Sequence, residues 1–263
     1  MISTLSIGAA YGEAAEFVRR EKKLLAPLVL AFLVLPMSVS QLVQPSNPFA
    51  DEGSGSWIPI AMLALLLQLV GQMVVSRLAM GWSGSLGEAL ALALRRLPVT
   101  IVALLLYFAC LTLLLVPLIT ILLLLSGGGA PGAGATRFIN SLTLLALLVA
   151  VPRVMLVPPF AMAEAIGPLA LVKRTWRASS GQFWRLLGFF LLFLIASAVL
   201  ALAVSTVVGT LAALAFGPAE PLSLSRLLIA LSGGLVQGIA GTLYAAMVGR
   251  VAVQLLARES KGT

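Results

Sequence analysis

The chain has 263 residues, of which 60% are hydrophobic and 10% charged, and it carries a formal net charge of +8. So few polar groups could not cover the surface of a water-soluble domain, which makes lipid the expected solvent. The single cysteine and the absence of histidine exclude an intrachain disulfide and the zinc sites and catalytic triads that need histidine. No cofactor and no metal site are expected.

Six apolar runs are long enough to cross the roughly 30 Å of a bilayer's hydrocarbon core, which takes about 20 helical residues. The runs are continuously apolar, which favours helices over the alternating pattern of transmembrane β-strands. The expected spans are residues 24–43, 57–76, 98–125, 138–162, 186–215 and 226–250. We therefore expect an all-α integral membrane protein of six transmembrane helices, built as a single domain over residues 1–263.

The polar segment that precedes the first span ends in "RREKK". A cleaved secretory signal peptide is one alternative here, because "SVS" at 38–40 resembles a cleavage site after an apolar run. The segment contains Glu13, Glu16 and Glu21, however, whereas the n-region of a signal peptide is short and basic. We therefore expect the first span to be an uncleaved helix.

The basic residues are distributed unevenly between the loops. Fourteen of the 17 Lys and Arg residues lie in residues 1–23, 77–96, 173–185 and 250–263. The intervening loops hold Arg137 and Arg226. The positive-inside rule then places these four segments, and both termini, in the cytoplasm. Because the charge follows topology in this way, the high pI does not indicate a nucleic-acid partner.

A few residues inside the spans favour helix-to-helix contacts. Gln68 and Gln72 lie one turn apart in the second span and Gln237 lies in the last, and interhelical hydrogen bonding is their expected role. Gly234 and Gly238 form a GxxxG pattern, which predicts close packing or self-association through the last span. Cys110, in the third span, is expected to be a small buried side chain.

The fourth span carries prolines at 152, 158 and 159 and is expected to be kinked or partly unwound towards its end. Arg153 lies in the same span, and an ionisable residue inside a span is expected to pair with another group or to line a substrate pathway. Glu164 follows the span and is expected to pair with Arg153, Lys173 or Arg177. The spacing alone does not choose between these three cations.

The stretch "PLALVKRTWRASS" at 168–180 predicts a short amphipathic helix, started by a proline and ended by Ser and Gly. Spacing predicts an apolar face of Leu169, Val172 and Trp176 beside a cationic face. Two interpretations are open: the charges only enforce topology, or they bind anionic lipid headgroups or a membrane protein partner. The candidate binding residues are Lys173, Arg174, Trp176, Arg177, Trp184 and Arg185.

Three segments have a similar pattern of a glycine, an apolar helical face and a basic cluster before a span. They are "YGEAAEFVRREKKLL" at 11–25, "LGEALALALRRLPVT" at 86–100 and "IGPLALVKRTW" at 166–176. They predict a three-fold internal repeat, in which each unit has a short amphipathic cytoplasmic helix, an outgoing span and a returning span. Chance similarity between Ala- and Leu-rich segments is the alternative.

The run "AEAIGPLALVKRTWRASSGQFWRLLGFFLLFL" resembles the membrane domain attached to some glycerophosphoryl diester phosphodiesterases and its stand-alone six-helix relatives. The matching residues are Glu164, Gly167, Ala170, Leu171, Arg174, Trp176, Phe183 and Trp184. The resemblance implies a protein of the bacterial cytoplasmic membrane. It does not imply phosphodiesterase activity, because in fused members the chemistry belongs to a separate soluble barrel that uses histidines.

Three classes of function follow. The favoured one is a non-enzymatic multi-pass membrane protein that engages anionic headgroups or a membrane partner through its cationic cytoplasmic helices. The alternative is a permease, or permease subunit, for a small or amphiphilic solute, indicated by Arg153, Glu164 and the interrupted fourth span. An intramembrane enzyme is not favoured, because its candidate acids Glu88 and Glu164 lie on separate segments.

Overall fold

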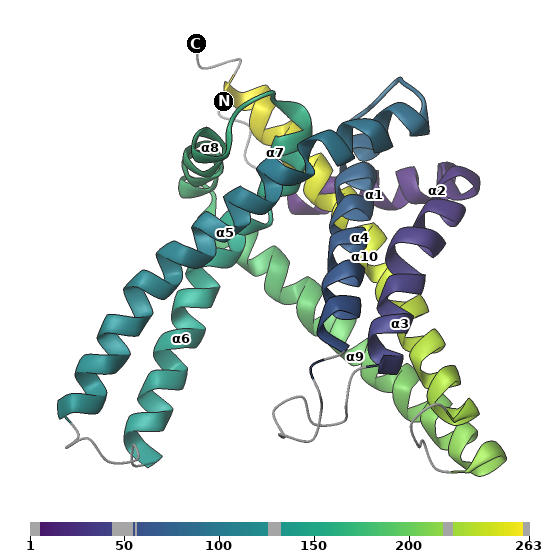
Figure 1. The fold of residues 1–263 in the computed structure, drawn as a ribbon. Helices are drawn as coiled ribbons and strands as arrows, with labels where there is room; N and C mark the ends of the chain where they lie inside the picture. Colours follow the sequence, from purple (N-terminus) through teal and green to yellow (C-terminus); the bar gives the residue numbers. More distant parts are fainter. Residues whose placement is uncertain (1–5, 44–54, 56, 126–132, 218–222, 260–263) are drawn as a thin grey trace. The chain divides into compact units, whose positions relative to one another are not determined.

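The computed structural model describes residues 6–43, 55, 57–125, 133–217 and 223–259, and within these ranges it contains helices and no β-strand. Six helical stretches in this part of the chain are long and apolar enough to cross a membrane (Figure 1). They are Lys22–Val43, Trp57–Ala79, Leu86–Ile121, Thr136–Ala163, Phe183–Phe216 and Leu224–Arg258. The prediction of an all-helical chain with six spans is therefore confirmed at the level of helix length and composition.

The chain divides into two compact units. The first, called here the α10 unit, comprises Met1–Leu94 and Leu191–Thr263, and the second, the α8 unit, comprises Arg95–Phe190. Two long helices, α5 (Leu86–Leu125) and α9 (Phe183–Phe216), contribute residues to both units.

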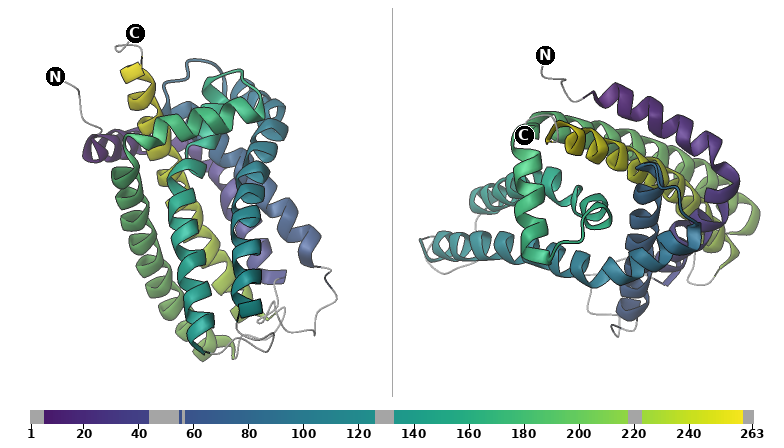
Figure 2. Two further views of the ribbon diagram at one scale, coloured as in Figure 1. Left: turned by 90° about the vertical axis from the view of Figure 1, so that its left-hand side faces the viewer. Right: turned by 90° about the horizontal axis from the view of Figure 1, so that it is seen from above.

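The α10 unit is organised around its last helix. Its elements are α1 (Ile7–Arg20), α2 (Lys22–Val29), the π-helical turn η1 (Leu30–Val34), α3 (Leu35–Val43), α4 (Trp57–Ala79) and α10 (Leu224–Glu259), with the adjoining parts of α5 and α9. Helix α10 packs against α4, α3, η1 and α1. The amphipathic α1 lies against the C-terminal part of α10 (Figure 2).

The GxxxG glycines of α10 are used for packing inside the chain. A Cβ atom at Gly234 would lie 2.9 Å from the carbonyl oxygen of Val34 and would overlap Ser38, and one at Gly238 would overlap the Val34 side chain. Gly249, further along α10, would place a Cβ 2.6 Å from the Ser76 carbonyl oxygen. The predicted close-packing helix is therefore present, and its partners are the first and second spans.

The first span is interrupted by one π-helical turn. Pro36 has no N–H with which to reach the carbonyl of Phe32, so the regular hydrogen-bond ladder is broken at this point. Leu30–Val34 adopts the wider π-helical spacing there. Val34, at the end of this turn, is the residue that meets Gly238 of α10.

The α8 unit contains the interruption predicted for the fourth span. Helix α6 (Ala133–Val154) stops and α7 (Val157–Ala163) begins after a two-residue turn. Pro158 and Pro159 have no backbone N–H, and prolines are well accommodated in the first turn of a helix. Helix α8 (Pro168–Ser180) follows, and the prediction of a kinked span is confirmed.

The third predicted span lies within a longer helix. Helix α5 is continuous from Leu86, with Pro98 and Pro117 inside it, and it contains the whole of the predicted span 98–125. Prolines are tolerated inside transmembrane helices when neighbouring groups or local adjustments of the helix satisfy the freed backbone carbonyls. Cys110 is exposed rather than buried, because an apolar run predicts an apolar surrounding and does not distinguish a protein core from lipid.

The three-fold repeat stays a prediction. α1 and α8 are separate helices that each precede a candidate span, as expected of two of the units. The corresponding segment of the middle unit is the first three turns of α5 and is continuous with its span.

Candidate functional site

Helix α8 begins and ends where its sequence predicts. Gly167 occupies the N-cap position with extended backbone, and its carbonyl oxygen accepts a hydrogen bond from Leu171 at 2.9 Å. Pro168 takes the first helical position, where its missing N–H would have had no intrahelical partner. Gly181 follows the last residue, Ser180.

The face by which α8 packs on its own unit is distinct from the predicted apolar face of Leu169, Val172 and Trp176. The buried residues are Leu171, Thr175, Ala178 and Ser179, at helical spacing. Leu169 and Trp176 are 64% and 50% exposed. A stripe of small and polar residues can be buried if its hydroxyls are satisfied, and large apolar residues can face outward in an apolar surrounding.

A hydroxyl pair connects α8 to α5. The Tyr107 hydroxyl oxygen lies 2.7 Å from Oγ1 of Thr175, and the tyrosine also donates to the carbonyl oxygen of Val172 at 3.2 Å. Both hydroxyl-bearing residues are buried. Sequence reasoning did not identify Tyr107, although a tyrosine in an otherwise apolar span signals a hydroxyl in need of a partner.

Glu164 pairs with Arg174, which is none of the three cations predicted for it. The Arg174 Nε donates to both carboxylate oxygens, at 3.0 and 3.2 Å, and the two side chains are 21% and 27% exposed for Arg174 and Glu164. The Arg174 guanidinium also lies 5.0 Å from the ring centroid of Phe160 on α7. The pairing follows from where α8 turns back after residues 164–167, which sequence spacing alone does not determine.

Arg153 is held by aromatic side chains. Its guanidinium carbon lies 3.9 Å from the ring centroid of Trp176 and 5.4 Å from that of Phe183. It also donates to the carbonyl oxygen of Val149 in its own helix. Arg153 and Glu164 thus have different partners, each within the α8 unit.

The candidate binding residues of this region fall into two groups. Arg174 and Trp176 contact Glu164 and Arg153 and so help to hold α8 in place. The second group is exposed and is called here the outer cationic face, formed by Lys173, Arg177, Trp184 and Arg185. Trp184 is 79% exposed and makes an edge contact with Phe183, with ring centroids 5.3 Å apart.

The predicted polar residues of the spans are only weakly engaged. The Gln68 amide donates to the Met37 sulfur at 3.7 Å, which links the second span to the first. Gln72 is half-buried and Gln237 is exposed on α10. Gln68 is therefore the glutamine for which an interhelical contact is found.

Glu88 has a structural role at the start of α5. Its carboxylate accepts from the Ser85 amide and its own amide donates to the Ser85 hydroxyl, both at 3.2 Å. This reciprocal arrangement is a helix capping box. Among the described residues, no group of three or more Cys, Asp or Glu side chains is arranged to hold a metal ion.

Comparison with known proteins adds no relative. No family model matches the chain, and neither the curated proteins nor the solved structures contain a match.

Proposed function

We propose that this chain is a non-enzymatic, multi-pass membrane protein that engages anionic lipid headgroups through the outer cationic face, which lies on α8 and the start of α9. The observation that supports the proposal is that one face of α8 is buried against its own unit and another face is exposed. The buried face of α8 contacts α5 through Thr175, while Lys173 and Arg177 stay exposed on the helix. Leu169 is also exposed, and Trp176 is half-exposed while it contacts Arg153 of α6.

That arrangement suits the boundary between headgroups and acyl chains. Exposed apolar side chains can enter the acyl boundary while neighbouring cations meet phosphate groups, at about 1 kcal/mol for each Lys or Arg near an anionic surface. The tryptophans belong to the residue type favoured at this depth. The proposal includes a cytoplasmic position for α8 in a bacterial inner membrane, which the distribution of basic residues and the resemblance to the phosphodiesterase-associated membrane domain support.

The test compares lipid selectivity of two variants in reconstituted bilayers. Lys173→Gln/Arg177→Gln removes two cations from the outer cationic face, and Arg137→Gln/Arg226→Gln removes two from the N-terminal ends of α6 and α10, which are expected on the opposite side. Spin-labelled phosphatidylglycerol and phosphatidylcholine report the relative association constant of each lipid with the protein. The first variant should lose preference for phosphatidylglycerol and the second should keep it. Equal selectivity in both variants would leave topology as the role of these cations.

A permease, or permease subunit, is the second candidate. The observation that favours it is the interruption between Val154 and Val157, which directly follows the cationic Arg153. Interrupted spans beside an ionisable residue are common at the binding sites of secondary transporters. Uptake of a panel of labelled small anions by proteoliposomes tests this candidate: flux that disappears in Arg153→Gln but persists in Arg137→Gln would favour transport over lipid engagement.

A further inference from the structure

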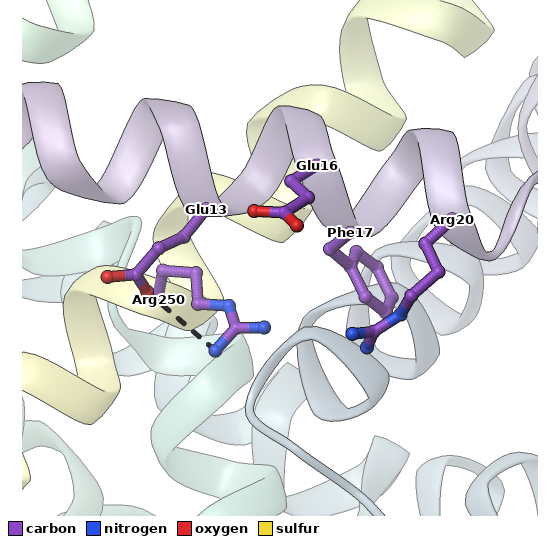
Figure 3. A pocket seen from close by; sticks show the side chains of 5 residues that line it. All are labelled: Glu13, Glu16, Phe17, Arg20 and Arg250. Atoms are coloured by element: carbon purple, nitrogen blue, oxygen red, sulfur yellow. Dashed lines mark ion pairs between the residues drawn. The ribbon is translucent and has the colours of Figure 1, made fainter.

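A hollow beside α1 and α10 carries charges of both signs. It has a volume of about 110 Å³ and is lined by Glu13, Glu16, Phe17 and Arg20 of α1 and by Arg250 of α10 (Figure 3). Glu13 and Glu16 are three residues apart and therefore share a helix face. Phe17 is buried and packs next to them.

The Arg250 guanidinium has unused hydrogen-bonding capacity. Its NH1 lies 3.7 Å from the Glu13 carboxylate, close enough for an ion pair and too far for a hydrogen bond. Its Nε is buried and has no hydrogen-bond partner among the described residues. A guanidinium has five N–H donors, and a buried donor without an acceptor costs free energy. The 3.7 Å ion pair leaves NH1 without a hydrogen bond to Glu13, so an additional acceptor in the hollow beside NH1 would be stabilising.

The charges around the hollow indicate the class of ligand. A simple anion would meet the two carboxylates, and a simple cation would meet the two guanidiniums. A zwitterion that joins a phosphate to a primary ammonium satisfies both, because guanidinium groups bind phosphate oxygens and an ammonium donates to carboxylates. The volume corresponds to about four water molecules, which suits a small headgroup.

The position along α10 indicates a lipid. Its candidate span runs over Leu224–Arg258 and is longer than the 20 or so residues that cross the hydrocarbon core. Twenty residues counted from Leu227 end at Ala246, so Arg250 lies one turn beyond, at headgroup depth. The N-terminal end of α1 is held at the same end of α10, where the Ser6 amide donates to the Gln254 side chain at 3.3 Å.

The geometry points to a headgroup site for phosphatidylethanolamine, in which Arg20 and Arg250 bind the phosphate and Glu13 and Glu16 bind the ammonium. The site lies on α1 and α10 and is independent of the lipid role proposed for α8. A failure of either can be recognised separately, because the two tests use different lipids and different residues.

The first experiment needs no substitution. The purified full chain in detergent is titrated with short-chain phosphatidylethanolamine, phosphatidylcholine and phosphatidylglycerol, and complexes are counted by native mass spectrometry. Phosphatidylcholine keeps the charges but its trimethylated nitrogen has no N–H, so ethanolamine lipid should bind about tenfold more tightly. Free phosphoethanolamine is titrated in a separate arm. Binding as tight as that of the lipid would support the same chemistry and assign it to a soluble ligand.

Two variants assign the preference to residues. Glu13→Gln/Glu16→Gln should abolish the preference for ethanolamine over choline lipid and leave phosphate binding in place. Arg20→Gln should weaken binding of all three lipids, whereas Arg19→Gln, an exposed cation of α1 outside the hollow, should not. Spin labels on Gly8→Cys of α1 and Ala257→Cys of α10, two exposed positions, in a Cys110→Ser background, report by their distance whether α1 stays docked in each variant.

Equal affinity of the wild-type chain for ethanolamine and choline lipids would overturn the proposal. An ethanolamine preference that survives Glu13→Gln/Glu16→Gln with α1 docked would also overturn it. If a variant releases α1, the wild-type comparison decides the outcome.

Discussion

In the α10 unit the helices approach one another closely at glycine residues, whereas in the α8 unit they contact one another through polar and aromatic side chains. Gly234 and Gly238 allow the first span to approach α10 at backbone distance. In the α8 unit, α8 is connected to its neighbours by the Tyr107 hydroxyl and the Glu164 and Arg153 charges. Close backbone packing is intolerant of any added atom, while a set of side-chain contacts can be lost one at a time.

The largest effect is expected in the α10 unit. Gly234→Ala should destabilise the protein by about 2 to 3 kcal/mol, because the added methyl group overlaps Ser38 and approaches the Val34 carbonyl oxygen. Gly241→Ala on the same helix is the matched control, since its Cβ would meet nothing within 4 Å. Thermal unfolding of the two variants in detergent measures the difference. Equal thermal midpoints for the two variants would show that the space between α10 and the first span can accommodate a methyl group at residue 234.

The ion pair of the α8 unit should have the next largest effect. A double-mutant cycle of Glu164→Gln and Arg174→Gln should give a coupling free energy of about 1 to 2 kcal/mol, because the pair is partly buried and the Arg174 Nε donates to both carboxylate oxygens. The exposed pair Arg20 and Glu21, at 2.9 Å, is the control and should give less than about 0.5 kcal/mol. Similar coupling free energies for both pairs would mean that partial burial does not strengthen the ion pair between Glu164 and Arg174.

Loss of a single hydroxyl should cost less. Tyr107→Phe removes the hydrogen bonds to Thr175 and Val172 and should destabilise the chain by about 1 kcal/mol. Tyr11 is 53% exposed, so Tyr11→Phe provides a control that should be near neutral. The thermal midpoint of each variant checks the expectation. A neutral Tyr107→Phe would show that α8 is held by its charged and aromatic contacts alone.

The smallest effect on stability is expected on the outer cationic face. Lys173→Gln/Arg177→Gln should change the free energy of unfolding by less than about 0.5 kcal/mol, because both side chains are exposed. The same variant should change lipid selectivity, so stability and selectivity separate the two faces of α8. A large loss of stability would instead give these cations a structural role in the α8 unit.

Features of local structure were predicted correctly where the residues of a single segment determine them. The limits of α8 follow from a glycine and proline at its start and a glycine after its end, and the interruption of the fourth span follows from its prolines. The close packing of α10 follows from the spacing of its glycines. These features depend on backbone geometry that the residues impose without reference to the rest of the chain.

Partners across the fold were predicted poorly. The choice of Arg174 for Glu164, and of Thr175 for Tyr107, depends on the angle at which α8 returns against α5 and α7. The buried stripe of α8 was not predicted. In a chain whose outer surface is itself apolar, hydrophobicity does not identify the side chain that faces protein.

The amino-acid sequence by itself determined the number of candidate spans, the limits of α8 and the break in the fourth span, because these follow from the apolar length and backbone sterics of single segments. Only the tertiary structure decided which spans meet at the glycines, which carboxylate holds which arginine, and that α1 and α10 together line a charged hollow. Those outcomes depend on contacts between residues far apart in the chain, and only the packing of whole helices brings such residues together.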